Sequence, residues 1–331
     1  MTNARVVSGM RPTGKLHLGH LVGALHNWVA LQEKYDCFYF VADWHALTSE
    51  YANTAGITGY ALDNVADWLA AGVDPERSTI FVQSLVPEHA ELFLLLSMVV
   101  PIPWLERVPT YKEQREQLVE KDLSTLGFLS YPLLQTADVI IYDGKFVPVG
   151  EDQVAHLELS REVVRRFHQF YGEIFVEPQP LLTPTPRLPG LDNRKMSKSY
   201  ANTIDLTDDA ETVKKKVRQM YTDPKRVRAD IPGTVEGNPV FIYHDVFNAN
   251  TAEVDDLKAR YREGKVGDVE VKTKLKAAIN AVLEPMRARR ADLDARPDYV
   301  KDVLFEGSRK ARVEAAETMA RVRDAMKLQY R

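Results

Sequence analysis

The stretch Val6-Val7-Ser8-Gly9-Met10-Arg11-Pro12-Thr13-Gly14-Lys15-Leu16-His17-Leu18-Gly19-His20 decides how the N-terminal half of this chain folds. Val6-Val7 is typical of a short buried strand, and the breakers between Gly9 and Lys15 predict a loop. From residue 17 to 34, apolar side chains return at helical spacing. A strand, a glycine-bearing loop and a helix in this order predict the first unit of an α/β fold.

The same alternation of strands and helices continues to about residue 150. Apolar runs predict strands at 37–41, 79–83, 139–142 and 146–149, and helical patterns cover 59–71 and 88–100. We expect a loop at 43–49. Strands that alternate with helices predict a parallel sheet with helices on both faces.

The character of the sequence changes near residue 178. Five prolines and Gly190 make the stretch from 178 to 190 irregular, and beyond about residue 205 the chain is mostly charged and helix-forming. We therefore expect three parts: a sheet-containing domain over 1–204, a helical domain over 205–295, and a C-terminal helix over 296–331 that packs back on the body.

The composition limits the class of protein. The chain has 331 residues, of which 45% are hydrophobic, so it can build a sizeable core. Its net charge of −4 is not that of a globally basic nucleic-acid binder. Cys37 is the only cysteine, which excludes a disulfide framework and a cysteine-based zinc site within one chain. No apolar run is long enough to span a bilayer and no secretory leader is evident, so we expect a soluble cytoplasmic protein.

Two segments carry groups suited to phosphates. The helix that begins near His17 presents backbone N–H groups and a positive dipole end, and Gly19 leaves room for a flat base against the backbone. His17 and His20 can donate hydrogen bonds to phosphate or ribose oxygens. The loop Lys195-Met196-Ser197-Lys198-Ser199 supplies two ammonium groups and two hydroxyls. Taken separately, each segment could equally be an ordinary turn or a solvated loop.

A third group of polar residues suggests a pocket for an amino acid. Tyr131, Gln135 and Asp138 are spaced to share one face of a helix in an otherwise apolar stretch. An ionised Asp138 only accepts hydrogen bonds, so it suits a substrate group that only donates, such as an indole N–H. A helix with a buried tyrosine and no ligand would show the same spacing.

The first two segments, in this order, resemble the signatures of the class I aminoacyl-tRNA synthetases, His-Ile-Gly-His and Lys-Met-Ser-Lys-Ser. The resemblance extends to the tryptophanyl-tRNA synthetase family through three further segments: Ala42-Asp43-Trp44-His45-Ala46, Gln83-Ser84-Leu85-Val86-Pro87 and Val147-Pro148-Val149-Gly150-Glu151-Asp152-Gln153. This family implies a Rossmann-type catalytic domain, a helical anticodon-recognising domain and a homodimer. It also implies ATP-dependent activation of tryptophan and its transfer to tRNA(Trp).

The resemblance assigns roles to individual residues. For catalysis it implies Lys195, Lys198, His17 and His20. For tryptophan it implies Asp138 as acceptor of the indole N–H, with Tyr131, Gln135, His45, Gln153 and Val7 lining the pocket. For ATP it implies Arg11, Pro12, Thr13, Gly19, His20, Gly150, Glu151, Asp152, Leu188, Lys195, Met196, Ser197, Lys198 and Ser199. Mg²⁺ is expected to arrive with ATP, and neither a resident metal site nor a prosthetic group is expected.

Three departures keep alternatives open. The chain has Arg11-Pro12-Thr13 where bacterial members often have Gln-Pro-Ser, Gly19-His20 where they often have Gly-Asn, and Gln135 where they often have methionine. Because the Tyr-Gln-Asp spacing also resembles tyrosyl-tRNA synthetases, tyrosine is the alternative substrate. A synthetase-like regulator or adaptor is a further alternative. A dinucleotide dehydrogenase is disfavoured, since no Gly-x-Gly-x-x-Gly follows the first strand.

Partner contacts are expected in the second half. Seven basic side chains lie within a short span, opposed in sequence only by Asp223, and they predict a patch that binds tRNA phosphates or a solvated helix face: Lys214, Lys215, Lys216, Arg218, Lys225, Arg226 and Arg228. The segment 101–111, with Trp104 among prolines, could form an apolar surface between subunits or an irregular part of the core.

Overall fold

The computed structural model describes residues 4–109, 123–150, 153–182, 188–197 and 200–330. They form two compact units, one of Met1–Gly14, Asn27–Pro184 and Arg296–Arg331, the other of Lys15–His26 and Thr185–Ala295. The helical unit thus takes in the first signature and begins earlier than the domain expected over 205–295. The expected domain roles of 1–204, 205–295 and 296–331 stay predictions.

The first unit is built on a sheet of five parallel strands in the order β3-β2-β1-β4-β5. This is the strand order of a doubly wound α/β sheet, as the sequence predicts. The strands are β1 (Arg5–Met10), β2 (Asp36–Val41), β3 (Ser78–Val82), β4 (Phe146–Val149) and β5 (Gln179–Leu182).

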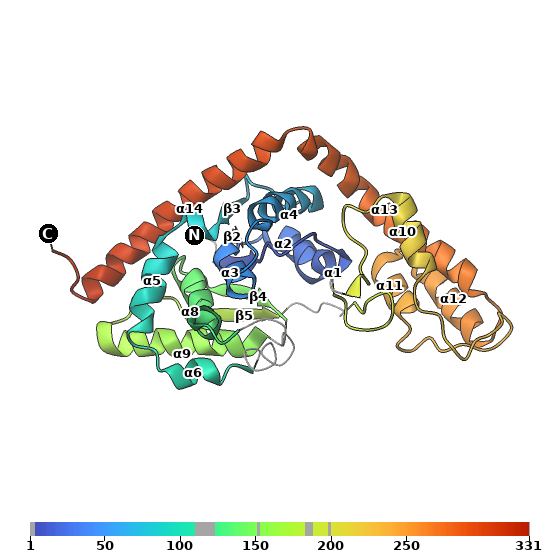
Figure 1. Cartoon of the computed structure of the whole chain (residues 1–331), viewed down its shortest axis with the longest axis horizontal. Coiled ribbons are helices and arrows are strands. Elements are labelled where there is room, and N and C mark those ends of the chain that lie inside the picture. Colours follow the sequence, from blue (N-terminus) through green and yellow to red (C-terminus); the bar gives the residue numbers. More distant parts are fainter. Residues whose placement is uncertain (1–3, 110–122, 151–152, 183–187, 198–199, 331) are drawn as a thin grey trace. The chain divides into compact units, whose positions relative to one another are not determined.

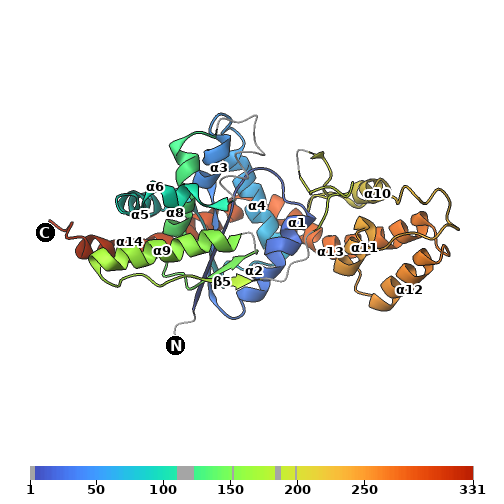
Figure 2. The ribbon, with the colours of Figure 1, turned by 90° about the horizontal axis from the view of Figure 1, so that it is seen from below.

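Helices connect the strands and cover the sheet (Figure 1). Those of the first unit are α3 (Asp43–Glu50), α4 (Ile57–Ala71), a 3-10 turn (Gln83–Leu85), α5 (Glu88–Ser97), α6 (Ile102–Glu106), α8 (Leu126–Ile140), α9 (Val154–Tyr171) and α14 (Pro297–Ala325), together with most of α2 (His26–Leu31). Figure 2 shows α9 alongside β5.

Both faces of the sheet are buried. Successive side chains of a strand point to opposite faces, and consecutive residues of β2 are buried. Phe38 and Phe40 of β2 belong to a core cluster that α5, α8, α9 and α14 also supply. Tyr39, between them, stacks on Trp28 of α2, whose ring meets Trp68 of α4 edge-on. The expected sheet with helices on both faces is therefore confirmed.

The long helix α14 lies along β3, which is an edge strand of the sheet (Figure 1). A Cβ on Gly307 would lie 1.9 Å from the carbonyl oxygen of Ile80, so only glycine permits this approach. The next residue, Ser308, accepts a hydrogen bond at Oγ from the Val82 N–H (3.1 Å). The helix thereby satisfies a backbone group that an edge strand would otherwise expose.

The structure corrects the prediction in three places. The expected loop at 43–49 is helix α3. The expected strand at 139–142 is the end of α8 and the turn after it, since a short apolar run does not distinguish a strand from a buried helix. The proline-rich stretch contains β5, and an edge strand tolerates Pro180 where a central strand would not.

The second unit is helical. The expected helix at 17–34 is confirmed: it begins with α1 (Leu18–His20), continues through a π-helical segment (Leu21–Leu25) and runs on into α2. The other helices are α10 (Ala210–Arg218), α11 (Pro239–Phe247), α12 (Thr251–Arg262) and α13 (Asp268–Asp294). None of the helices in the described ranges combines the length and apolar character that a membrane crossing requires.

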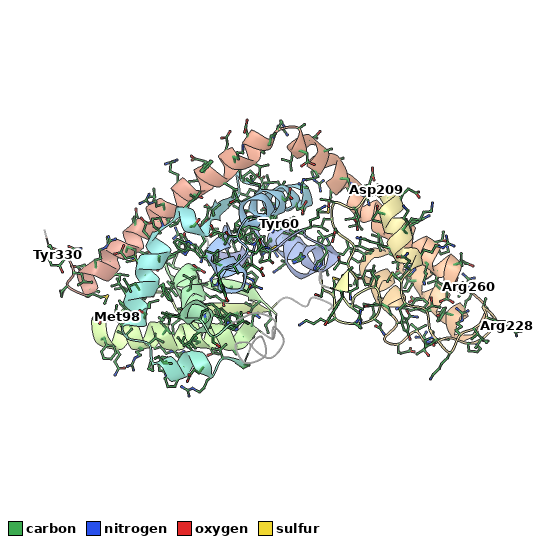
Figure 3. The ribbon with its side chains drawn as sticks, viewed as in Figure 1. Tyr60, Met98, Asp209, Arg228, Arg260 and Tyr330 are labelled. Carbon is green, nitrogen blue, oxygen red and sulfur yellow. The ribbon has the colours of Figure 1, made fainter. Side chains whose placement is uncertain are left out.

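The expected basic patch of the second unit is largely paired. Arg226 is buried, donates to Asp268 and to the Ile231 carbonyl, and stacks on Tyr261 with 4.0 Å between its Cζ and the ring centroid. Three more members form ion pairs: Lys214 with Glu211, Lys216 with Asp208, and Arg228 with Asp230. Figure 3 shows Arg228 at the surface. Asp223 is the only acid within the basic run, but acids just outside the run also pair with its members, and Asp268 reaches Arg226 through the fold.

The segment 101–111 is mixed in character. Ile102 is exposed, Leu105 is buried, and Trp104 is partly buried under the Arg166 guanidinium. Its last two residues lie outside the described ranges.

Candidate functional site

The first signature forms the N-terminal end of α1. His17 is the N-cap residue: its Nδ1 accepts from the Gly19 N–H (3.2 Å), while His20 Nδ1 accepts from the His17 N–H (3.1 Å). The two rings lie 3.9 Å apart. Because each Nδ1 accepts, the proton of each neutral imidazole is on Nε2. Both histidines therefore have a capping role, and each carries its donor proton on Nε2.

The fold brings the second signature to the first. The Leu18 N–H donates to the Ile204 carbonyl (3.0 Å), and the Leu206 N–H donates to the Leu16 carbonyl (2.9 Å). We call the second signature, residues 195–199, the lysine loop. The chain after it pairs antiparallel with the chain that enters α1, and His17 forms a β-bridge with Asp205. A Cβ on Gly19 would lie 2.9 Å from Met196 Sδ. Two segments far apart in sequence share one backbone ladder.

The remaining predicted residues of the lysine loop are only partly described. Lys195 forms a bridge with Pro189, next to the half-buried Leu188, and Ser197 follows Met196. Lys198 and Ser199 lie outside the described residues.

The loop after β1 supplies the predicted ATP residues of the first unit. Arg11 is exposed and interacts electrostatically with Glu50 and Tyr131, while Pro12 is buried. The Thr13 N–H donates to the Arg11 carbonyl (2.9 Å), which closes a tight turn. Directly after β4, the strand that neighbours β1 on the side opposite β2, the Gly150 carbonyl accepts from the Gln153 N–H (3.0 Å) at the start of α9. Glu151 and Asp152 lie outside the described ranges.

Asp138 is the centre of a buried polar network in the first unit. It is fully buried on α8 and accepts three hydrogen bonds. Gln83 Nε2 (2.8 Å) and His89 Nδ1 (2.6 Å) donate to Oδ1, and His45 Nε2 (2.7 Å) donates to Oδ2. The donors come from the turn after β3, from α5 and from α3, so three elements converge on one carboxylate.

The network keeps Asp138 ionised. Burial raises the pKa of its carboxyl, but the hydrogen bonds from His45 and His89 outweigh burial and lower the pKa to about 2. Since a carboxylate only accepts, the facing nitrogen of each histidine must donate. His89 Nε2 is hydrogen-bonded to the Tyr142 hydroxyl (2.6 Å), and burial raises the pKa of that phenol well above its usual value.

The other predicted tryptophan residues lie near α9 or in the core. Gln135 Oε1 accepts from His156 Nδ1 (3.1 Å), and the rings of Tyr131 and His156 lie 5.6 Å apart. Gln153 is the N-cap residue of α9. Val7 is fully buried in the core cluster.

The predicted residues therefore fall into two groups, one in each unit. Asp138 and His45 are in direct contact, Tyr131 and Gln135 share His156, and the two signatures meet through Gly19 and Met196.

Sequence reasoning missed His89, Gln83, Tyr142 and His156. A usable signal existed for His89, which is spaced with Leu92 and Leu96 on the buried face of α5. A histidine at a core position of an apolar helix needs a polar partner. Gln83 stood within a segment that supports the family resemblance, but nothing local indicates that it reaches Asp138.

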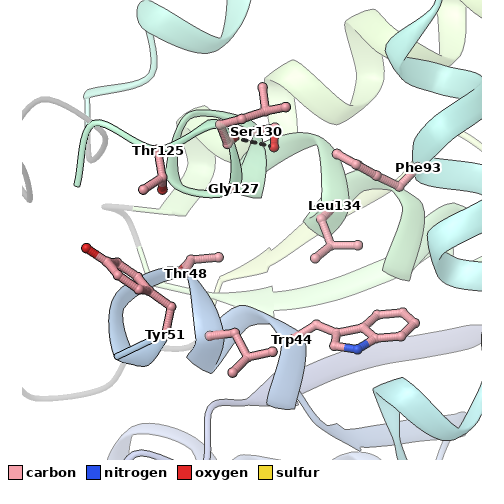
Figure 4. Close-up of a pocket in the computed structure, with 10 residues that line it drawn as sticks. Trp44, Thr48, Tyr51, Phe93, Thr125, Gly127, Ser130 and Leu134 are labelled. Atoms are coloured by element: carbon pink, nitrogen blue, oxygen red, sulfur yellow. Dashed lines mark hydrogen bonds between the residues drawn. The ribbon is translucent and has the colours of Figure 1, made fainter. Parts of the chain in front are cut away.

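A separate apolar pocket of about 420 Å³ opens between α3 and α8. Figure 4 shows Trp44, Thr48 and Tyr51 of α3 on one side, Ser130 and Leu134 of α8 on another, and Phe93 of α5 beside them. His45 and Asp138 are not among the residues that line it. None of the lining residues is one of the predicted site residues.

Comparison with known proteins agrees with this geometry. The chain matches the model of the tRNA synthetases class I (W and Y) over residues 1–284. The tryptophan–tRNA ligase of Thermotoga maritima is 51% identical over 327 residues, which cover 98% of this chain and 100% of that protein. That of Treponema pallidum is 49% identical over 330 residues, 99% of this chain and 98% of that protein.

A solved structure extends the likeness to three dimensions. The tryptophanyl-tRNA synthetase of Campylobacter jejuni, complexed with ADP and tryptophan, superposes with a TM-score of 0.87 at 33% identity, covering 98% of this chain and 99% of that one. The matched family, the two ligases and this structure agree along nearly the whole chain. The chain belongs to the class I tRNA synthetases (W and Y).

Proposed function

We propose that the protein is a tryptophan–tRNA ligase, which activates tryptophan with ATP and transfers it to tRNA(Trp). Its near-full-length similarity to the ligases of Thermotoga maritima and Treponema pallidum supports this function. The observation in the structure that favours tryptophan is the Asp138 network. Its carboxylate cannot donate, so it suits an indole N–H.

The number of hydrogen bonds on Asp138 is consistent with one more donor. A carboxylate has about four acceptor positions, and the three donors of the network use two on Oδ1 and one on Oδ2. In the proposed complex the indole N–H takes the remaining position on Oδ2. An amino acid without that donor leaves the position unsatisfied, which is how such a site rejects an analogue.

The chemistry needs positioning more than acid–base catalysis. The ionised carboxylate of tryptophan attacks the α-phosphorus of ATP in line, a new P–O bond forms, and pyrophosphate leaves with the electrons of the broken bond. A ribose hydroxyl of tRNA then attacks the mixed anhydride and AMP leaves. No base is needed for the first step because the nucleophile is already ionised.

The two signatures would handle the phosphates. In this proposal His17 and His20 donate from Nε2 to ATP, with the backbone N–H groups of the α1 end beside them. Lys195 and Lys198 neutralise the charge that builds up on the phosphates, assisted by Ser197 and Ser199, and Mg²⁺ accompanies ATP as part of the substrate. Met196 and Leu188 would border the nucleotide.

The other assignments extend the proposal. Arg11, Pro12, Thr13 and the Gly150-Glu151-Asp152 turn complete the ATP site, and His45, Tyr131, Gln135, Gln153 and Val7 the tryptophan site. Residues 1–204 would form the catalytic domain, 205–295 the anticodon-recognising domain and 296–331 a C-terminal helix on the body. We propose a cytoplasmic homodimer.

The test is ATP–pyrophosphate exchange with purified protein and each amino acid in turn, followed by charging of tRNA(Trp). Exchange with tryptophan and charging of that tRNA are expected. Exchange with tyrosine instead would show that the protein is a tyrosine–tRNA ligase. No exchange with any amino acid would overturn the proposal and leave a regulator or adaptor.

A further inference from the structure

Asn202, three residues after the lysine loop, bonds to the backbone of that loop through both the oxygen and the nitrogen of its side-chain amide. It is buried, with 4% of its surface exposed. Its Nδ2 donates to the Lys195 carbonyl (3.1 Å) and to Asp192 Oδ1 (2.8 Å), and its Oδ1 accepts from the Ser197 N–H (2.9 Å). One side chain thus clamps the backbone on both sides of Met196.

The surroundings fix the orientation of this amide. Asp192 is ionised, since the hydrogen bond from Asn202, with others from Arg194, lowers its pKa to about 2. A carboxylate accepts only, so the nitrogen of Asn202 must face Asp192 and the oxygen must face Ser197. The backbone of Asn202 is held as well, because its carbonyl accepts from the Leu191 N–H (3.0 Å).

Gly190 makes room for the clamp. A Cβ at this position would lie 2.0 Å from Asn202 Nδ2 and 2.5 Å from its Cγ. The amide therefore packs directly against the Gly190 backbone, and any larger residue would push it off Lys195 and Ser197. Neither Gly190 nor Asn202 is among the residues to which the family resemblance gives a role.

We propose that Asn202 is a positioning residue for adenylate formation, which holds the backbone around Met196 so that Lys195 is presented to the phosphates of ATP. The proposal rests on the proposed phosphate-binding role of Lys195. It also explains the contact between Met196 and Gly19, because a fixed backbone on either side of Met196 keeps its side chain against the first signature.

The first experiment compares Asn202→Ala with Arg194→Ala as a matched control. Arg194 also bonds to Asp192, through Nε (2.7 Å), but its side chain is exposed and its other described contact is with the ring of Tyr200. In ATP–pyrophosphate exchange we expect Asn202→Ala to lower kcat about 30-fold and to change the KM for tryptophan less than about twofold, because the hydrogen bonds of Asn202 go to none of the residues proposed for the tryptophan site. Arg194→Ala should stay within about twofold of wild type in both. A kcat of Asn202→Ala within twofold of wild type, or an equal loss in Arg194→Ala, would overturn the proposal.

Two double variants separate positioning from simple destabilisation. In a Lys195→Ala background, Asn202→Ala should cost far less than it does alone, since the residue acts through that lysine and its loop. Likewise Gly190→Ala should lower kcat strongly in the wild type but add little in the Asn202→Ala background, because the new methyl group has no Asn202 amide to clash with there. Full additivity in both pairs would show a general structural role and overturn the proposal.

A readout independent of activity separates failure of this proposal from failure of the proposed function. Hydrogen exchange at the Ser197 amide should be slow in wild type and in Arg194→Ala, and fast in Asn202→Ala. If wild type exchanges pyrophosphate with no amino acid while this pattern holds, the proposed function fails and the clamp stands. If hydrogen exchange at the Ser197 amide is equally fast in all three proteins, Asn202 does not hold the loop and the proposal is wrong, whatever the activity.

Discussion

Asp138 and Asp192 reach a similar acidity in two different environments. Both carboxyls have a pKa lowered to about 2. Asp138 is fully buried, and burial works against its ionisation until two imidazoles outweigh it, whereas Asp192 lies at the surface with 33% of its side chain exposed. Asn202 and Arg194 lower the pKa of Asp192 with little burial to oppose them. The ionised form of Asp138 depends on each of its hydrogen-bond donors, whereas water can replace a lost donor at the exposed Asp192.

This difference suits the two carboxylates to the different tasks proposed for them. A carboxylate without water discriminates between ligands by what they donate, because an unsatisfied position there has no alternative partner. A carboxylate at the surface of a loop can orient an amide and still allow the loop to move.

The largest effect is expected for Asp138→Ala. Loss of the acceptor should reduce tryptophan-dependent pyrophosphate exchange by roughly 10³-fold or more, because the indole N–H is left without a partner in a buried site. ATP binding, measured by calorimetry without tryptophan, should be unchanged. Near-normal exchange in this variant would show that Asp138 does not bind the substrate.

His89→Leu should have the next largest effect. It removes one donor from Asp138 and leaves the buried Tyr142 hydroxyl without its hydrogen-bond partner, so we expect the free energy of unfolding to fall by about 2–3 kcal/mol and the KM for tryptophan to rise roughly tenfold. His89→Asn is the matched control, since its amide can still donate near the position of Nδ1. Equal tryptophan KM values for both variants would mean that the donor to Asp138 does not matter.

Acid unfolding tests the buried charge directly. The folded pKa of Asp138, about 2, lies below the ordinary value of 3.8, so its ionised form stabilises the fold above about pH 4. That contribution, on the order of 2 kcal/mol, should be lost as the pH falls from about 4 to about 2. Urea unfolding at about pH 5 and about pH 3 should show a smaller stability loss in Asp138→Asn than in wild type. An equal loss of stability in wild type and Asp138→Asn would show that another group titrates in this pH range.

Asp192→Asn should give the smallest effect. The substituted amide keeps an acceptor oxygen for Asn202 but loses the charge, and water screens the site, so unfolding at neutral pH should be unchanged. We expect kcat for exchange to fall only about threefold. A loss as large as that of Asn202→Ala would mean that the charge, rather than the amide geometry, holds the loop.

Much of the fold could be read from local pattern. The strand at Val6-Val7, the helix that ends at Gly72 and the strand at 37–41 are all present, and Gly72 has the left-handed φ of 111° that its role as a helix C-cap requires. Two of the misses, α3 and the end of α8, are short segments in which polar or apolar runs fit two structures equally well. Their conformation is decided by what they contact, such as the Ser84 hydroxyl, which donates to Asp43 in the first turn of α3 (2.5 Å).

The sequence by itself determined the α/β class and the two signatures, and it predicted a role for Asp138, because periodicity and motif spacing are local properties of the chain. Only the tertiary structure decided that His45, Gln83 and His89 surround that carboxylate, that Arg226 is buried rather than exposed to RNA, and that Gly190 faces Asn202. These pairs join separate elements or depend on the path of an irregular loop. Such contacts follow from how the elements pack, and packing leaves no local pattern in the sequence.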